Sequence, residues 1–277
     1  MPNADPTPRH AQLPGLGQVC RLGLATRGNT SLEPDDVRAA VDRGVNYLNW
    51  CGHADGMSAA VRALGDRRGE VIVATQLYAR TGDAVRRELD AALVELGTDY
   101  LDVVTYFYLE TDDEWQQATA ADGAHRALRE AQTAGRVRAI GVTSHQRPLA
   151  ARIAESGVVD LLMIRYNAAH RGAESEIFPV ADAGRLPLVV YTGVRWGALL
   201  KPTPDDPPGF VPPTAAECYR FQLDEPAVSV ALMAPDGRAQ LEQNLALLDD
   251  WRPLSPARKA ELRDHGDRVR RHAGQFP

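Results

Sequence analysis

Eight short apolar runs, each followed by a longer amphipathic segment, constrain the fold of this chain more than any other feature of its sequence. The runs are rich in valine, leucine and isoleucine, and apolar and polar residues alternate little within them. Such runs are typical of parallel strands that are covered on both faces. They lie at residues 21–26, 47–51, 71–76, 101–108, 137–144, 161–166, 188–192 and 228–234.

The segments between the runs carry the end signals of helices, such as Gly97 and Gly135 just past two of them. Eight strand–helix units predict one α/β domain over residues 1–277, a (β/α)₈ TIM barrel at about 18–250 with an added C-terminal helix at about 255–272. A doubly wound open sheet is the alternative. No GxGxxG motif follows the first run, and eight near-even units favour closure.

Charge and composition exclude several kinds of partner. The net charge of −6 leaves no basic footprint for nucleic acid. No apolar run approaches the roughly 18–20 residues that cross a membrane, and the first residues lack the pattern of a secretory signal. Three widely spaced cysteines form neither a disulfide framework nor a zinc site. We therefore expect a cytoplasmic protein that acts on a small molecule; the oligomeric state is left open.

In a barrel of this type the active site lies at the C-terminal strand ends. His53 and Asp55 follow the second run and are acid–base candidates, because a histidine changes charge near neutral pH. Tyr108 ends the fourth run and would need a neighbouring cation to act as an acid, for which Arg165 is the candidate. Arg165 is also placed to bind an anionic group. The spacing of Cys51, His53 and Asp55 would allow a metal, but no HxH or HExxH motif supports one, and we expect none.

A proline-rich segment leaves the seventh strand. Lys201–Pro213 contains six prolines in 13 residues, which predicts a stiff, extended loop rather than a flexible linker. A loop of this length in a compact domain is usually functional. We therefore expect it to contribute to the catalytic face.

Several of these stretches resemble the aldo/keto reductase superfamily. The matching stretches occur in the family's order and are Gly44–Tyr47, Gly97–Asp102, Arg136–Ser144, Tyr191–Lys201 and Ala231–Asn244. The resemblance implies a barrel that reduces carbonyl groups with NADPH through an Asp–Tyr–Lys–His tetrad.

The tetrad itself departs from the family's pattern, as in a divergent branch. Asn49 stands at the Asp position, Gln76 at the Lys position and Phe107 at the His position, and no tyrosine stands near Ala54. The two amides keep bulk and hydrogen bonds but remove the charges. A tyrosine with a pKa near 10 needs the lysine charge to act as an acid near pH 7. Only two of the 31 basic residues are lysines, and both lie far from this position in the sequence.

The family's cofactor positions are partly kept. Tyr191 stands where an aromatic ring stacks on the nicotinamide, and Thr143 and Ser144 stand where its carboxamide is held. The resemblance therefore implies NADP(H). The candidates on the pyrophosphate and adenosine side are Arg195, Arg238, Gln243 and Asn244.

Three functions remain open at this level. The first is an NADP(H)-linked oxidoreductase for a small polar or anionic substrate, with Tyr108 or His53 as a rebuilt acid. The second is a redox-neutral barrel enzyme that uses acid–base chemistry, such as a lyase, an isomerase or a hydrolase. The third is a catalytically silent ligand-binding barrel.

Overall fold

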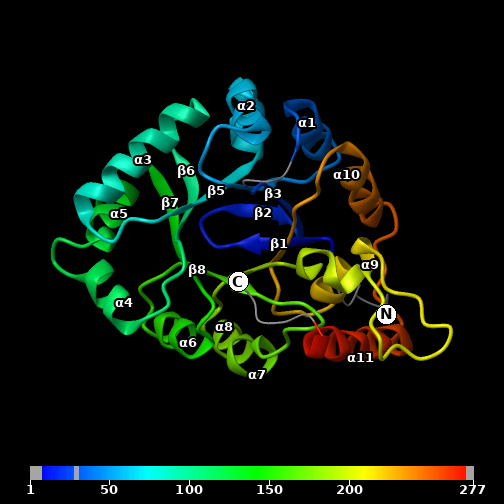
Figure 1. Cartoon of the computed structure of the whole chain (residues 1–277). Coiled ribbons are helices and arrows are strands. Elements are labelled where there is room, and N and C mark those ends of the chain that lie inside the picture. Colours follow the sequence, from blue (N-terminus) through cyan, green and yellow to red (C-terminus); the bar gives the residue numbers. More distant parts are fainter. Residues whose placement is uncertain (1–7, 28–30, 273–277) are drawn as a thin grey trace, which may run out of the picture.

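Eight parallel strands close into a barrel in the computed structural model, which describes residues 8–27 and 31–272 (Figure 1). The barrel closes where β10 pairs with both β3 and β9. The predicted (β/α)₈ fold is confirmed, and each predicted run coincides with one strand of the barrel to within a few residues. The strands are β3 (Leu22–Ala25), β4 (Tyr47–Trp50), β5 (Ile72–Leu77), β6 (Leu101–Tyr106), β7 (Val137–Ser144), β8 (Leu161–Arg165), β9 (Leu188–Tyr191) and β10 (Val230–Met233).

Helices surround the barrel, and the added C-terminal helix is present as α11 (Pro256–His272). The segment after β4 forms α2 (Gly56–Ala63) and the 3₁₀ helix η1 (Gly65–Glu70). An additional helix, α4 (Asp112–Thr119), lies between β6 and α5. The remaining helices are α1 (Pro34–Asp42), α3 (Gly82–Leu96), α5 (Ala124–Thr133), α6 (Arg147–Glu155), α7 (Ala173–Glu176), α8 (Phe178–Gly184), η2 (Arg195–Leu200), α9 (Ala215–Leu223), α10 (Arg238–Leu245) and η3 (Ala246–Leu248).

A short hairpin lies before the barrel and was not predicted. Its strands β1 (His10–Leu13) and β2 (Gly17–Cys20) pair antiparallel. Leu13, Leu16 and Val19 are buried in one cluster with the side chains that fill the barrel. The hairpin therefore seals one end of the barrel, and the opposite end, where the strands finish, is left for ligands.

The proline-rich loop is fastened to α11. Asp206 accepts hydrogen bonds from Arg268 Nε at 2.6 Å and from Thr203 N at 2.6 Å, and it contacts His265 Nδ1 at 3.3 Å. His265 is fully buried, and its Nε2 lies 3.0 Å from the carbonyl oxygen of Leu199 in η2. The helix thus fixes the loop that leaves β9. Among the described residues, no helix combines the length and the apolar character needed to cross a membrane.

Candidate active site

A cavity of about 820 Å³ lies over the C-terminal ends of the barrel strands. Asn49, Gln76 and Met163 form its part at the barrel centre, and Gln243 and Asn244 of α10 form its far end. A cavity of this volume is within the range of ligand sites. The cavity is therefore the first candidate for an active site.

Two amide side chains meet at the barrel centre. Gln76 Nε2 donates a hydrogen bond to Asn49 Oδ1 at 2.7 Å and lies 3.6 Å from Met163 Sδ. Asn49 is buried and Gln76 is half-buried. Parallel pairing of β4 with β5 places the two residues on neighbouring strands at this end of the barrel. The centre of the cavity therefore carries a neutral polar pair.

The loop after β4 forms a small hydrogen-bonded cluster. Cys51 Sγ lies 3.3 Å from His53 Nε2 and donates to Asp55 Oδ2 at 3.2 Å. Asp55 also caps α2 by accepting from Ser58 N at 2.8 Å. His53 is exposed and lines the cavity, whereas Asp55 does not. Among the described residues no group of three or more His, Cys, Asp or Glu side chains is arranged to hold a metal ion.

Tyr108 occupies a left-handed backbone conformation with φ 43°. Arg80 holds this turn, because its Nη2 donates to the carbonyl oxygens of Phe107 at 2.5 Å and Tyr108 at 3.2 Å. Leu109 N continues the turn by donating to Thr143 O at 2.9 Å. Tyr108 is half-buried and lines the cavity. The strained turn thus points a phenol into the candidate site, as functional strain often does.

Charged and aromatic groups surround the Tyr108 hydroxyl. Burial raises the pKa of Tyr108, the positive charge of Arg165 opposes the rise, and Glu110 adds to it. The His145 ring packs on Tyr108 with centroids 4.2 Å apart, and its Nδ1 lies 3.4 Å from Glu110 Oε1. Burial, then the charge of Arg165, lowers the pKa of His145. Tyr191 is a further neighbour, and burial raises its pKa well above the ordinary value.

Arginines make the region behind Tyr191 positive. Burial lowers the pKa of Arg165, and the charge of Arg147 lowers it further. Burial and then the charges of Arg165, Arg195, Arg270 and Arg147 lower the pKa of His170 to about 3. His170 is therefore neutral at pH 7, while the arginines keep their charge. Arg165 does not line the cavity itself but acts on Tyr108 and Tyr191 from behind.

The loop after β8 is held mainly by α11. Arg171 forms a two-pronged ion pair with Asp267, with Nη2 at 2.9 and 3.0 Å from the two carboxylate oxygens. Glu174 pairs with Arg263 Nη2 at 2.7 Å. Asn167 joins this loop to the next one by donating from Nδ2 to Thr192 O at 2.8 Å. Arg171 and Glu174 of this loop thus form ion pairs that attach the loop to α11.

The loop after β9 has an unusual backbone. Thr192, Arg195 and Trp196 have φ values of 62°, 48° and 50°, and Gly197 follows with 83°. The N–H groups of Arg195 and Gly197 donate within the loop, to Thr192 O and Val194 O, each at 3.0 Å. Trp196 and Gly197 line the cavity. The loop therefore presents an aromatic ring and a glycine to the cavity.

The predicted cofactor residues divide into two groups. Thr143, Tyr191, Gln243 and Asn244 all line the cavity.

The other three have different partners outside its lining. Ser144 Oγ accepts from Gln146 N at 3.0 Å, and buried Arg195 donates to Val269 O at 3.4 Å. Exposed Arg238 pairs with Glu242 at 2.7 Å and with Asp36 at 3.3 Å.

Tyr78 and Arg80 are not among the predicted site residues, although Tyr78 lines the cavity and Arg80 supports it. Trp196, next to Gly197 in the Tyr191–Lys201 stretch, also lines the cavity. No local pattern identifies Arg80, because its partners Phe107 and Tyr108 follow the next strand, β6.

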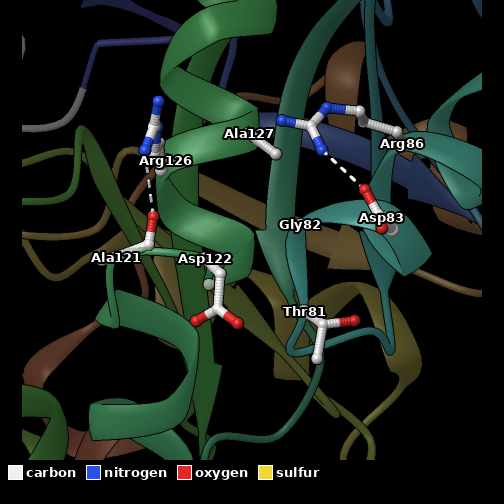
Figure 2. Close-up of a pocket in the computed structure, with 9 residues that line it drawn as sticks. Thr81, Gly82, Asp83, Arg86, Ala121, Asp122, Arg126 and Ala127 are labelled. Atoms are coloured by element: carbon white, nitrogen blue, oxygen red, sulfur yellow. Dashed lines mark hydrogen bonds and ion pairs between the residues drawn. The ribbon is translucent and has the colours of Figure 1, made fainter.

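A second hollow, of about 280 Å³, lies at the N-terminal ends of α3 and α5 (Figure 2). Arg86 donates to Asp83 at 3.0 Å, and Arg126 donates to the carbonyl oxygen of Ala121 at 3.4 Å. Figure 2 shows both contacts as dashed lines. Both guanidinium groups also pair with Glu130, at 2.8 and 3.0 Å. Because carboxylates already hold both cations, we assign no ligand to this hollow.

A closed (β/α)₈ barrel with a cavity over its C-terminal strand ends is typical of barrel enzymes that bind small molecules at that end. The sequence pattern of the Aldo/keto reductase family matches residues 21–215. This match covers more than half of the chain, and the chain belongs to the aldo/keto reductase family.

Known proteins agree with this assignment. The NADH-specific methylglyoxal reductase of Escherichia coli (strain K12) is 27% identical over 129 residues, which are 45% of this chain and 37% of that protein. The chain thus matches well under half the length of that relative.

Solved structures share the whole fold. An aldo/keto reductase from Klebsiella pneumoniae in complex with NADP and acetate has a TM-score of 0.75 at 20% identity, over 95% of this chain and 96% of that chain. The glycerol dehydrogenase of Gluconobacter oxydans has a TM-score of 0.72 at 21% identity, over 97% of each chain.

Proposed function

We propose that this chain is an NADP(H)-linked oxidoreductase that interconverts a carbonyl group and an alcohol on a small polar or anionic substrate. One observation carries the proposal: a single cavity contains four of the seven predicted cofactor residues together with the acid–base candidate Tyr108. The structure of the Klebsiella pneumoniae relative with NADP supports it. The reaction would proceed without the family's standard tetrad, because Asn49 and Gln76 are neutral.

The residues present fit the cofactor. Tyr191 lines the cavity, and its buried hydroxyl interacts with the side chain of Tyr108, so an aromatic ring and a polar group face the ligand together. Thr143 and Tyr191 would hold the nicotinamide end, and Trp196 and Gly197 would pack along the pyrophosphate. Gln243 and Asn244 would hold the adenosine end. When bound, the nicotinamide ring supplies or accepts a hydride.

Tyr108 is the proton donor in this proposal. Its hydroxyl gives a proton to the carbonyl oxygen during reduction and takes it back during oxidation. The charge of Arg165 stabilises the phenolate that remains, and it also attracts a polar or anionic substrate group. Gln76 and Asn49 orient the substrate by hydrogen bonds at the barrel centre. His53, at the mouth of the cavity, is the second donor to test.

Titration with NADPH and NADH, followed by a carbonyl panel that includes methylglyoxal, tests the proposal. We expect saturable binding that quenches the fluorescence of Trp196, which is 52% exposed in the cavity wall. No binding of either cofactor at millimolar concentration sinks the proposal. Binding without turnover of any carbonyl supports a ligand-binding barrel. Turnover without cofactor supports redox-neutral chemistry.

A further inference from the structure

Four arginines from four different elements act on the loop that follows β8. They lie at the start of α6, at the end of β8, in η2 and on α11, and they are Arg147, Arg165, Arg195 and Arg270. Burial and then the charges of these four side chains lower the pKa of His170, which lies in this loop, to about 3. None of the four lines the cavity over the strand ends. We call these four residues the arginine cluster.

Direct contacts with the backbone hold two of the guanidinium groups in place. Arg147 packs against Gly172, where a β-carbon would lie 2.6 Å from the guanidinium carbon, so the glycine lets the charged group approach the loop. Arg195 is 4% exposed and donates from Nη1 to the carbonyl oxygen of Val269 at 3.4 Å, one residue before Arg270 on α11. Part of the cluster is therefore positioned by the protein itself. A preorganised group loses less conformational freedom when it binds a ligand.

The cluster concentrates positive charge in an acidic chain. The whole chain has a net charge of −6. Burial and then the charges of Arg165 and Arg270 nevertheless lower the pKa of Arg195. Burial also lowers the pKa of Arg165, and the charge of Arg147 lowers it further. Guanidinium groups that destabilise one another's charged form are stabilised by an anion placed among them.

Carboxylates balance part of this charge. Glu176 Oε1 accepts from Arg147 Nε at 2.9 Å, and the charge of Glu110 acts on Arg165. The charges that act most strongly on His170 are nevertheless all positive. A further anion would therefore lower the electrostatic energy of the cluster. The positive field also attracts anions from solution.

We infer that the arginine cluster is a second ligand site, separate from the cavity, and that it binds a phosphate group. A phosphate group carries about 1.5 to 2 negative charges near pH 7 and offers three acceptor oxygens, so one group can pair with several arginines. Arginine keeps its charge even where it is partly buried, and its planar N–H donors match phosphate oxygens. Inorganic phosphate and a small phosphate monoester both offer this chemistry. The site needs neither cofactor nor carbonyl, so it is independent of the proposed function.

Isothermal titration calorimetry of the full chain with inorganic phosphate, and separately with glycerol 3-phosphate, tests the site at constant ionic strength. We expect saturable binding that sodium chloride does not reproduce. Arg270→Gln should weaken the binding roughly three- to tenfold, and Arg165→Gln, which removes a half-buried charge, by roughly tenfold or more. Arg271→Gln is the matched control on the same helix. Arg271 pairs with Asp205 at 3.1 Å outside the cluster, so affinity should stay within about twofold of the wild type.

The two ligands separate the sources of the phosphate group. Tighter binding of glycerol 3-phosphate than of inorganic phosphate would support a phosphorylated metabolite as the ligand. Equal affinity would support recognition of the phosphate group alone. Both results require the weaker binding in Arg270→Gln.

Arg27→Gln is a second control, because Arg27 lines the cavity. Loss of phosphate binding in folded Arg27→Gln, with wild-type binding in Arg270→Gln and Arg165→Gln, would place the phosphate in the cavity and overturn the inference. Absence of saturable binding to the wild type at millimolar concentrations also overturns it. Thermal melting checks that each variant is folded. Phosphate binding at the cluster without any nicotinamide binding keeps this site and rejects the proposed function, while cofactor binding without phosphate binding does the reverse.

Discussion

The left-handed backbone of Tyr108 lowers the stability of the fold at a residue that lines the cavity. A left-handed conformation costs an L-residue roughly 1–2 kcal/mol. Among the described residues, five non-glycine residues have positive φ, and four of them are Tyr108 and three residues of the loop after β9. The three hydrogen bonds that Arg80 donates to the carbonyl oxygens of Tyr78, Phe107 and Tyr108 offset the strain. Strain concentrated around one cavity supports a functional role for that cavity.

Replacement of Tyr108 by phenylalanine removes the proposed proton donor and keeps the ring. We expect the rate of carbonyl reduction at saturation to fall by roughly 10²–10⁴-fold. Cofactor affinity, measured by fluorescence titration, should change little. Tyr100→Phe is the control, because Tyr100 lies outside the cavity and packs under Arg68. A wild-type rate in Tyr108→Phe would contradict a tyrosine donor and would leave His53 as the donor to test.

The pH profile of reduction tests the same assignment. The donor must carry its proton, and burial raises the pKa of Tyr108 above the ordinary value of 10 while Arg165 only partly opposes the rise. Reduction should therefore stay constant through neutral pH and fall only above about pH 10. An imidazole donor would lose its proton near pH 6.5. A steady-state profile that falls between pH 6 and 8 would contradict a tyrosine donor.

At the scale of elements, the sequence predicted what depends on local pattern. The apolar runs identified all eight barrel strands, because each run is long enough to show the continuous apolar sequence of a strand covered on both faces. The hairpin of β1 and β2 was not predicted, because its four-residue strands are too short to show a clear pattern of apolar residues. The ion-pair partners of Arg171 and Glu174 were not predicted either, because they lie on α11, 96 and 89 residues further along the chain. The polar and aromatic residues at the strand ends could be predicted from the sequence. The hydrogen bonds from Arg80 to the backbone of the turn after β6 could not.

Asp206 is the residue through which α11 holds the loop after β9. Its side chain is only 9% exposed. Burial alone would raise its pKa, but hydrogen bonds from Thr203, Arg268 and His265 outweigh burial and lower the pKa to about 2. Because the pKa is lower in the folded state than the ordinary 3.8, Asp206 stabilises the fold above about pH 4. This stabilisation is lost as the pH falls toward 2.

Asp206→Asn should therefore lower the free energy of unfolding at pH 7 by about 1.5–3 kcal/mol, since Arg268 loses a charged partner. Urea unfolding at several pH values measures the effect, and the difference from wild type should shrink between pH 4 and pH 2. Asp205→Asn is the matched control. Asp205 is exposed and pairs with exposed Arg271 and His272, so its loss should change stability by less than about 1 kcal/mol. Equal effects of the two variants would contradict the anchoring role of Asp206.

The whole molecule divides its tasks between the two ends of the barrel. The hairpin closes one end with apolar side chains that join the barrel interior. The other end carries polar, charged and strained residues around the cavity. In barrels of this type, the first end serves stability and the second serves chemistry. A substitution at each end should therefore separate the two properties.

Leu13→Ala tests the closed end. Leu13 is 3% exposed and packs among the side chains that fill the barrel, so its truncation leaves a cavity. We expect the free energy of unfolding to fall by roughly 2–4 kcal/mol, while ligand affinity and the rate of reduction, measured well below the melting temperature, stay at the wild-type level. Tyr108→Phe should show the opposite pattern, with an unchanged melting temperature and slower reduction, because it keeps the ring and removes only the hydroxyl group that lines the cavity. Loss of ligand affinity in folded Leu13→Ala would show instead that the hairpin also sets the shape of the cavity, through the side chains stacked between the two ends.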